Sequence, residues 1–212
     1  FNIGDEIWGH INALNGGGYA EYVKVKAENI YYKPENFDFI QAAAIPLAGL
    51  TAYQSLVDYG KVKENSEILI NGCTGGVGSV AVQVAKFLGC GVTGVCSTKN
   101  IEYAKSIGVD EIVDYKQENI LNSNKTFDSI YDFVGNMVFS EAKKMLKENG
   151  SFITVNPSLP LLIFGGLVNC FRAKKCKGML VKSSSDNLKK LKNMAESDAL
   201  KATVEQVFPL QK

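Results

Sequence analysis

The chain has 212 residues, a net charge of +1, 46% hydrophobic and 21% charged residues, which is typical of a globular protein with one large or two small domains. Its lysines are interleaved with acids and Arg172 is its one arginine, so the charge pattern argues against a nucleic-acid partner. Five cysteines without a Cys-x-x-Cys pair indicate reduced thiols in a cytosol-like compartment.

A metal site built from histidine and cysteine is also disfavoured, because His10 is the only histidine and no cysteine cluster accompanies it. We therefore expect no zinc. The most apolar run, residues 159–171, contains Pro160 and two glycines and is too short to span a bilayer. We expect no membrane span. The run is expected in the core or at a subunit interface, which leaves a homodimer open.

Residues 1–43 are expected to be rich in β-strands. Two candidate strands, residues 5–9 and the alternating residues 19–25, flank a glycine turn at residues 16–18. A helical pattern begins at Gln41 and continues to about residue 56, and Pro46 breaks or starts a helix within it.

The most informative stretch is ILINGCTGGVGSVAVQVAKFLG, from Ile68 to Gly89. Residues 68–70 are expected to form a short buried strand of a parallel sheet, and a glycine-rich turn follows. From Val77 the apolar residues recur at helical spacing until Gly89, which is placed to end the helix. A helix N-terminus reached through a glycine turn can hold a pyrophosphate, so this unit predicts a dinucleotide site. The alternative is a plain turn between strand and helix, because Cys73 departs from the usual Gly-x-Gly-x-x-Gly pattern.

Cys73 is expected to be the most reactive of the five thiols in the cofactor-free chain. It comes just before the helix N-terminus, where the positive end of the helix dipole stabilises a thiolate. A bound pyrophosphate is expected to cover it.

Further strands and helices alternate along the rest of the chain. Strands are expected at residues 91–95, 111–115, 129–134, 151–155 and 177–182, and helices at residues 100–107, around 138–146 and at 186–196. Residues 116–125 are expected to be a loop or short helix, and residues 203–208 a last strand. Such alternation predicts right-handed crossovers and an α/β fold with a doubly wound parallel sheet of the Rossmann type.

The end of the second strand of such a sheet indicates which dinucleotide binds. An NAD site usually has an acid there for the ribose 2′-hydroxyl, whereas residues 96–100 read Cys-Ser-Thr-Lys-Asn. Hydroxyls and a lysine suit the 2′-phosphate, so Ser97 and Lys99, with Tyr115 at the end of the third strand, favour NADP(H). The alternatives are a solvated loop with an incidental lysine, and a packing role for Tyr115.

Several stretches resemble the zinc-independent quinone oxidoreductases of the medium-chain dehydrogenase/reductase superfamily, nearest to their reticulon-interacting and plant envelope branch. They are AAAIPLAGLTAYQSL, LINGCTGGVGSVAVQVAK, CSTKN, VDEIVDY and FDSIYDFVG, in this order along essentially the whole chain. The chain departs from the family at Cys73-Thr74, where an Ala-Ser pair is usual. Leu47 stands where zinc members have a ligand cysteine, and residues 9–18 contain none of the cysteines of their zinc lobe.

The resemblance implies roles for individual residues at an NADP(H) site. Thr51 would lie near the nicotinamide, and Asn156 would face the same end or serve only as a turn residue. The pyrophosphate would lie along Gly75, Gly76, Val77 and Gly78, the 2′-phosphate among Ser97, Lys99 and Tyr115, and the adenosine beside Val134 and Gly135. No catalytic residue is assigned.

The resemblance also implies a two-domain enzyme, in which a Rossmann domain accompanies a β-rich GroES-like catalytic domain. Residues 1–43 would be a partial GroES-like domain, residues 44–183 the NADP-binding Rossmann domain, and residues 184–212 a terminal helix and strand returning to the catalytic domain. The chain is expected to be truncated at both ends and poorly active alone. Its expected location is cytoplasmic, with organelle import left open.

The function implied by the resemblance is hydride transfer from NADPH to a small-molecule quinone or α,β-unsaturated carbonyl (enone). Two alternatives remain open at this point. One is an alkenal or enoyl reductase of the same superfamily. The other is a non-catalytic NADPH-binding interaction module, since Rossmann folds serve many functions.

Overall fold

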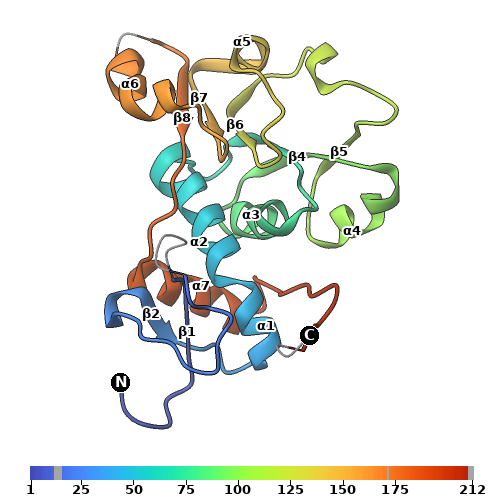
Figure 1. Ribbon diagram of the computed structural model, residues 1–212. Coiled ribbons are helices and arrows are strands. Elements are labelled where there is room, and N and C mark those ends of the chain that lie inside the picture. The colour runs from blue at the N-terminus through green and yellow to red at the C-terminus, as the bar shows by residue number, and fades with distance from the viewer. Residues whose placement is uncertain (12–15, 171, 210–212) are drawn as a thin grey trace. The chain divides into compact units, whose positions relative to one another are not determined.

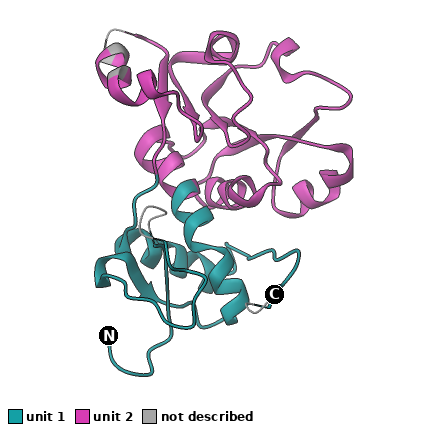
Figure 2. Ribbon diagram, viewed as in Figure 1, with its two compact units in different colours: residues 1–51, 181–212 teal, residues 52–180 magenta. Residues whose placement is uncertain are grey.

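The computed structural model describes residues 1–11, 16–170 and 172–209. Two compact units divide the chain (Figure 2): residues 1–51 together with 181–212, and residues 52–180. The domain boundaries expected from the sequence, after residues 43 and 183, fall near these divisions and stay predictions.

The larger unit is built on a six-stranded sheet in which all neighbouring strands are parallel. Its strands are β3 (Glu67–Asn71), β4 (Gly91–Cys96), β5 (Glu111–Asp114), β6 (Phe127–Asp132), β7 (Leu146–Thr154) and β8 (Lys175–Gly178). Their spatial order is β5-β4-β3-β6-β7-β8, so the direction of winding reverses beside β3. This order confirms the expected α/β fold with a doubly wound parallel sheet.

Helices cover both faces of this sheet. Figure 1 shows α3 (Gly76–Phe87) and α4 (Ile101–Ser106) on one side, and α5 (Phe139–Ala142) and α6 (Leu159–Cys170) on the other. Short 3₁₀ turns complete the connections: η3 (Thr98–Asn100), η4 (Ile120–Asn122) and η5 (Lys143–Met145). Because both faces are covered, consecutive residues of the central strand β3 are apolar, and Ile68, Leu69 and Ile70 are fully buried.

The smaller unit pairs two short antiparallel strands, β1 (Ile7–Gly9) and β2 (Ile30–Tyr32), and contains η1 (Ala27–Asn29), α1 (Phe39–Ala44) and α7 (Ser185–Glu196). A capping box starts α1: Gln41 N donates to Asp38 Oδ1 at 2.7 Å, and Asp38 N donates to Gln41 Oε1 at 3.1 Å. Pro46 starts α2 (Pro46–Gln54), which continues as the π-helical stretch η2 (Ser55–Gly60) of the larger unit. Pro is favoured at a first helical position because its missing N–H has no helical partner there.

Two strands expected from alternating residues are wrong. Neither residues 19–25 nor residues 203–208 form a strand in the structure described here. Alternation produces a strand where one face can be buried, and the large side chains Tyr19, Tyr22 and Phe208 are instead exposed. Residues 210–212, the end of the expected terminal segment, lie outside the described residues.

Three other elements have bounds that differ from those expected. The strand expected at 129–134 is β6, which begins two residues earlier, and the strand expected at 177–182 is β8, at Lys175–Gly178. The helix expected around 138–146 is α5, which continues as the 3₁₀ turn η5 to Met145, and Leu146 already belongs to β7. The apolar run at 159–171 forms helix α6 as far as Cys170, and residue 171 lies outside the described residues.

Candidate functional site

The glycine turn between β3 and α3 presents backbone N–H groups. Gly72 has φ +78°, a left-handed conformation that favours glycine, and Gly75 is the N-cap of α3, with its own amide donating to Gly72 O at 3.0 Å. Gly76, Val77 and Gly78 form the first turn of the helix, where amide groups have no partner inside the helix. Together with the positive end of the helix dipole, these groups make the turn suitable for an anion such as a pyrophosphate.

The neighbouring strands end beside this turn. The sheet register places Asn71 of β3 beside Asp132 of β6, and Asp132 beside Thr154 of β7. Val134, Gly135 and Asn156 follow these strands, Ser97 and Lys99 follow β4, and Tyr115 follows β5. The structure therefore brings all ten predicted residues of the larger unit to the edge of the sheet that is formed by the carboxyl ends of its strands, where open α/β sheets bind ligands.

Two of the loops at this edge are in direct contact with their neighbours. A β-carbon on Gly72 would lie 2.6 Å from Val134 Cγ2, so the loop after β6 packs against the glycine turn. A β-carbon on Gly135 would lie 2.9 Å from Asn156 Cβ, and Gly135 has φ +83°. The loops after β3, β6 and β7 therefore form one continuous surface.

The loop after β4 contains the residues expected around a 2′-phosphate. Ser97 is buried, whereas Lys99 and Tyr115 are exposed. Tyr115 N donates to Cys96 O at 3.1 Å, which holds the start of the β5 loop against the end of β4. Asn100 Nδ2 donates to Thr74 Oγ1 at 3.1 Å and so links this loop to the glycine turn.

Sequence reasoning missed an acid near this loop. Asp114, at the end of β5, lies beside Cys96 in the register and accepts a 2.5 Å hydrogen bond from Thr98 Oγ1. Lys116 N and Gln117 Nε2 also donate to its carboxylate, at 3.0 and 3.1 Å. The hydrogen bond from Thr98 is the main cause that holds the pKa of Asp114 below its ordinary value of 3.8. The carboxylate therefore ties the loop after β4, at Thr98, to the loop after β5, at Lys116 and Gln117.

Sequence reasoning also missed the polar side chains beneath the loop after β6. Asn71, Asp132 and Asn136 are joined by hydrogen bonds through Asn71 Nδ2, which donates to Asp132 Oδ1 and Asn136 Oδ1 at 2.8 Å each. Asn71 and Asp132 are separated by 61 residues, so the contact depends on the pairing of β3 with β6 and has no local signal.

Thr51, the remaining predicted cofactor residue, belongs to the smaller unit. It lies in α2, is buried, and its hydroxyl donates to Leu47 O at 2.7 Å. Its role near a nicotinamide stays a prediction.

The expectation that Cys73 is especially reactive is wrong. Its thiol is fully buried, and burial, followed by the neighbouring thiol of Cys96, raises the pKa of Cys73 to about 12. The side chain points under the turn: a β-carbon on Gly94 of β4 would lie 2.7 Å from Cys73 Sγ.

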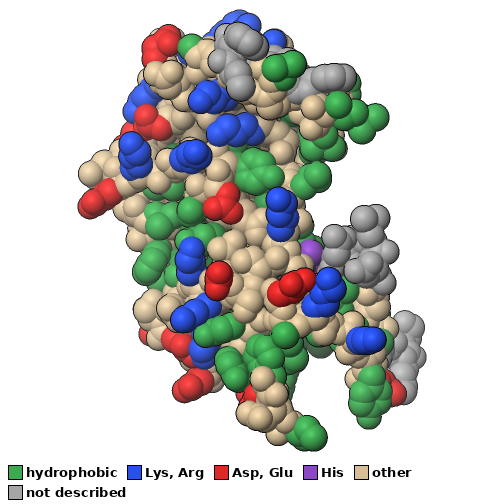
Figure 3. All heavy atoms as spheres, turned by 90° about the vertical axis from the view of Figure 1, so that its left-hand side faces the viewer, with side chains coloured by type: hydrophobic (Ala, Val, Ile, Leu, Met, Phe, Trp, Pro, Cys, Tyr) green, Lys and Arg blue, Asp and Glu red, His purple; other side chains and the backbone are tan. Residues whose placement is uncertain are grey.

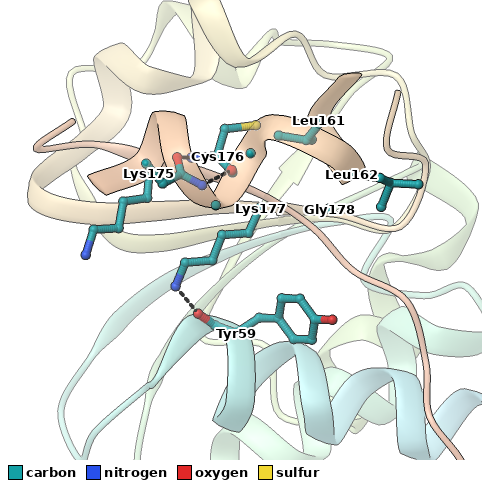
Figure 4. A pocket seen from close by; sticks show the side chains of 10 residues that line it. Tyr59, Leu161, Leu162, Lys175, Cys176, Lys177 and Gly178 are labelled. Atoms are coloured by element: carbon teal, nitrogen blue, oxygen red, sulfur yellow. Dashed lines mark hydrogen bonds between the residues drawn. The ribbon is translucent and has the colours of Figure 1, made fainter. Parts of the chain in front are cut away.

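A separate cavity of about 410 Å³ lies between η2, α6 and β8 (Figure 4). Leu161 and Leu162 come from α6, and the Lys177 amine extends from β8 and donates to Tyr59 O at 2.5 Å. Asn169 of α6 bonds both backbone groups of Cys176, with Nδ2 donating to Cys176 O at 2.6 Å and Cys176 N donating to Oδ1 at 2.9 Å. None of the predicted cofactor residues lines this cavity.

Within residues 1–11, 16–170 and 172–209, no three His, Cys, Asp or Glu side chains gather where they could hold a metal ion. Residues 12–15 of the stretch expected to replace a zinc lobe lie outside the described residues. No helix of the described chain is both long and apolar enough to cross a membrane. Acidic and basic side chains are interspersed on the face drawn in Figure 3.

The chain is similar to several known proteins. Residues 76–196 match a family model described as zinc-binding dehydrogenase. The chloroplast envelope quinone oxidoreductase homolog of Arabidopsis thaliana is 31% identical over 222 residues, which cover 100% of this chain and 68% of that protein. The 2-methylene-furan-3-one reductase of Solanum lycopersicum is 35% identical, over 97% of this chain and 51% of the relative.

A solved structure extends the comparison to three dimensions. The structure of the quinone oxidoreductase from Coxiella burnetii superimposes with a TM-score of 0.86 at 31% identity, covering 99% of this chain and 66% of the other. The chain thus spans about two thirds of the length of this protein and of the Arabidopsis relative.

Proposed function

The chain belongs to the quinone oxidoreductase-like branch of the medium-chain dehydrogenase/reductase superfamily, and from this membership we propose that it is an oxidoreductase that transfers hydride from NADPH to a quinone or an α,β-unsaturated carbonyl. The observation that carries the proposal is the glycine turn at the sheet edge. The backbone of Gly72 touches Gly78 so closely that no side chain fits at position 78, and the first turn of α3 is open to a ligand.

The residues of the turn fit a dinucleotide. Outside its own stretch of the helix, no atom lies within 4 Å of a β-carbon placed on Gly76, so the backbone at Gly76 is accessible to a pyrophosphate. The amides of Gly76, Val77 and Gly78 would hold the pyrophosphate, with Gly75 shaping the start of the helix. Val134 and Gly135 would border the adenosine, because their loop already packs against the turn.

NADP(H) rather than NAD(H) is proposed from the loop after β4. Ser97 and the exposed Lys99 would bind the 2′-phosphate, with Tyr115 beside them. Asp114 is also near this loop, but its oxygens already accept hydrogen bonds from Thr98, Lys116 and Gln117. Its proposed part is therefore to hold the loop.

The proposed chemistry is divided between cofactor and chain. NADPH, when bound, supplies the hydride, and the chain supplies position and electrostatics. Asn156 and Thr51 are proposed at the nicotinamide end, where they would orient the ring. No proton donor is assigned.

Zinc does not fit the described residues. Leu47 occupies the position at which zinc members have a ligand cysteine, and the described chain gathers no trio of metal-binding side chains. No step is therefore proposed through a metal.

Of the two substrate classes in this proposal, the enone has support from a named relative. It is favoured by the 35% identity to the 2-methylene-furan-3-one reductase, whose name describes reduction of an enone. A non-catalytic NADPH-binding module is the alternative function. Such a module would bind NADPH at the same glycine turn but would not catalyse its oxidation.

Calorimetric titration of the 212-residue chain with NADPH and with NADH tests the cofactor first. We expect saturable binding with NADPH the tighter ligand. Oxidation of NADPH is then followed at 340 nm with a quinone or an enone present. Oxidation of NADPH supports the enzyme over the binding module, and no binding of either nucleotide contradicts the proposal.

A further inference from the structure

Asp132 is a buried carboxylate at the end of β6, only 1% exposed. Its Oδ1 accepts hydrogen bonds from Asn71 Nδ2 at 2.8 Å, Gly135 N at 2.9 Å and Val134 N at 3.3 Å, and its Oδ2 accepts one from Met137 N at 3.0 Å. None of the ion pairs found among the described residues includes it. The charge is therefore stabilised by N–H donors alone, and most of them belong to the following loop.

Asn71 completes this arrangement. Its side-chain amide has two N–H groups, and one bonds Asp132 while the other bonds Asn136 Oδ1. Residues 134–137 are thus tied at every position to a pair of side chains on the central strands β3 and β6. A loop held in this way has its conformation set by two buried side chains at the ends of β3 and β6.

The loop is also the part that touches the glycine turn. Val134 packs so closely against Gly72 that a β-carbon on Gly72 would lie 2.6 Å from Val134 Cγ2, and Gly135 packs against Asn156. A displacement of the loop would therefore move side chains at both ends of the proposed dinucleotide site.

We propose that Asp132 is a positioning residue for the dinucleotide: without touching the ligand, it fixes residues 134–137 in the conformation that the glycine turn requires. The proposal rests on the proposed cofactor, and it predicts that removal of the carboxylate weakens NADPH binding. By charge alone, removal of a carboxylate near a pyrophosphate would tighten binding, whereas loss of positioning weakens it.

The test compares Asp132→Asn with Asp128→Asn. Asp128 lies at the other end of the same strand and accepts from Glu67 N at 2.8 Å and Lys147 Nζ at 2.9 Å, so it controls for loss of a carboxylate from β6. NADPH dissociation constants are measured by calorimetry well below the unfolding midpoint of each variant. We expect Asp132→Asn to weaken NADPH about tenfold, because its amide cannot accept from Met137 N, and Asp128→Asn to change it less than about twofold.

Amide hydrogen exchange separates positioning from stability. Exchange at Val134, Gly135 and Met137 is expected to accelerate in Asp132→Asn and not in Asp128→Asn. Acceleration confined to these amides would not follow from a general loss of packing.

Asn136→Ala keeps the proposal testable if Asp132→Asn does not fold, because Asn136 is exposed and its loss removes one tie only. We expect it to weaken NADPH about threefold. Unchanged or tighter NADPH binding by Asp132→Asn, or by Asn136→Ala where the former is unfolded, overturns the positioning role. Absence of NADPH binding by the wild-type chain overturns the proposed cofactor, and with it this role.

Discussion

A β-carbon on Gly78 would lie 2.0 Å from the carbonyl oxygen of Gly72 and 2.8 Å from its carbonyl carbon. Both atoms are backbone, so neither can turn aside as a side chain would. The start of α3 therefore lies against the end of β3 only because position 78 is glycine. Gly76, two residues earlier, has no atom within 4 Å of its β-carbon position outside its own stretch of the helix.

Gly78→Ala is expected to disrupt the turn and abolish NADPH binding. Because the clash is with backbone, we also expect lower stability, by about 1–3 kcal/mol. The matched variant Gly76→Ala should leave the unfolding midpoint nearly unchanged, yet weaken NADPH because its methyl group would stand where the pyrophosphate approaches. Thermal unfolding and calorimetric titration of both variants check this, and equal stability of the two would contradict the packing argument.

Lys99→Gln is expected to weaken NADPH about tenfold and leave NADH unchanged. A hydrogen bond to a charged group contributes about 1.5–3 kcal/mol, and only NADPH has the 2′-phosphate that would receive it. Lys189→Gln, an exposed lysine of α7, is the control. Equal weakening of both nucleotides would remove Lys99 from the phosphate site.

Asp114 is expected to make stability depend on pH in the acid range. Its pKa in the folded chain is lower than its ordinary value of 3.8, chiefly through Thr98, so its contribution is present above pH 3.8 and is lost as the pH falls through the folded pKa. The difference in melting temperature between wild type and Asp114→Asn should be constant near neutral pH and shrink below 3.8. Glu118→Gln, an exposed neighbour, serves as the control, and a gap that persists in acid would refute the assignment.

Gly60→Ala is expected to destabilise the larger unit by about 1–3 kcal/mol. A β-carbon at this position would lie 1.8 Å from Tyr131 Oη, and Tyr131 is fully buried with its hydroxyl bonded to Ser129 Oγ at 3.0 Å. Adding Tyr131→Phe removes the oxygen and should restore part of the loss, since Tyr131 Cζ is still 2.8 Å away. Urea unfolding of the single and double variants measures both effects, and purely additive losses would mean that the two residues do not clash.

Cys73 is expected to be alkylated slowly in the folded chain at pH 8. With a pKa of about 12 and no exposed surface, the thiol is neither ionised nor accessible. Mass-spectrometric mapping of iodoacetamide labelling, with and without urea, should show fast labelling of Cys73 only after unfolding. Rapid labelling of the native chain would restore the expectation drawn from the sequence.

The sequence predicts best what is encoded locally. The change from strand to helical spacing at residues 68–89 identified β3, the glycine turn and α3, because each depends on neighbours a few residues apart. Residues 203–208 show the limit of the same reasoning, since alternation forms a strand only if a partner covers one face, and Phe208 is 73% exposed.

Contacts between strands had no such signal. Thr98 and Asp114 are separated by 16 residues and Asn71 and Asp132 by 61, and both pairs meet only because of the sheet register. The residues proposed at the cofactor were named from the glycine turn, the end of the second strand and the family resemblance, and they stay predictions, whereas the residues that support them from beneath had no signal in the sequence.

The side chain of Asn169 has a consequence for assembly. β8 is the last strand of the sheet, and Met179 N donates to Thr154 O of β7. Because the backbone groups of successive residues in a strand point to alternate sides, the N–H and C=O of Cys176 point away from β7. Open strand edges invite pairing with other chains, which leads to aggregation. Because Asn169 bonds both groups of Cys176, its amide takes the place of an incoming backbone and protects the edge at that residue. Any chain that extends the sheet through Cys176 must first displace Asn169.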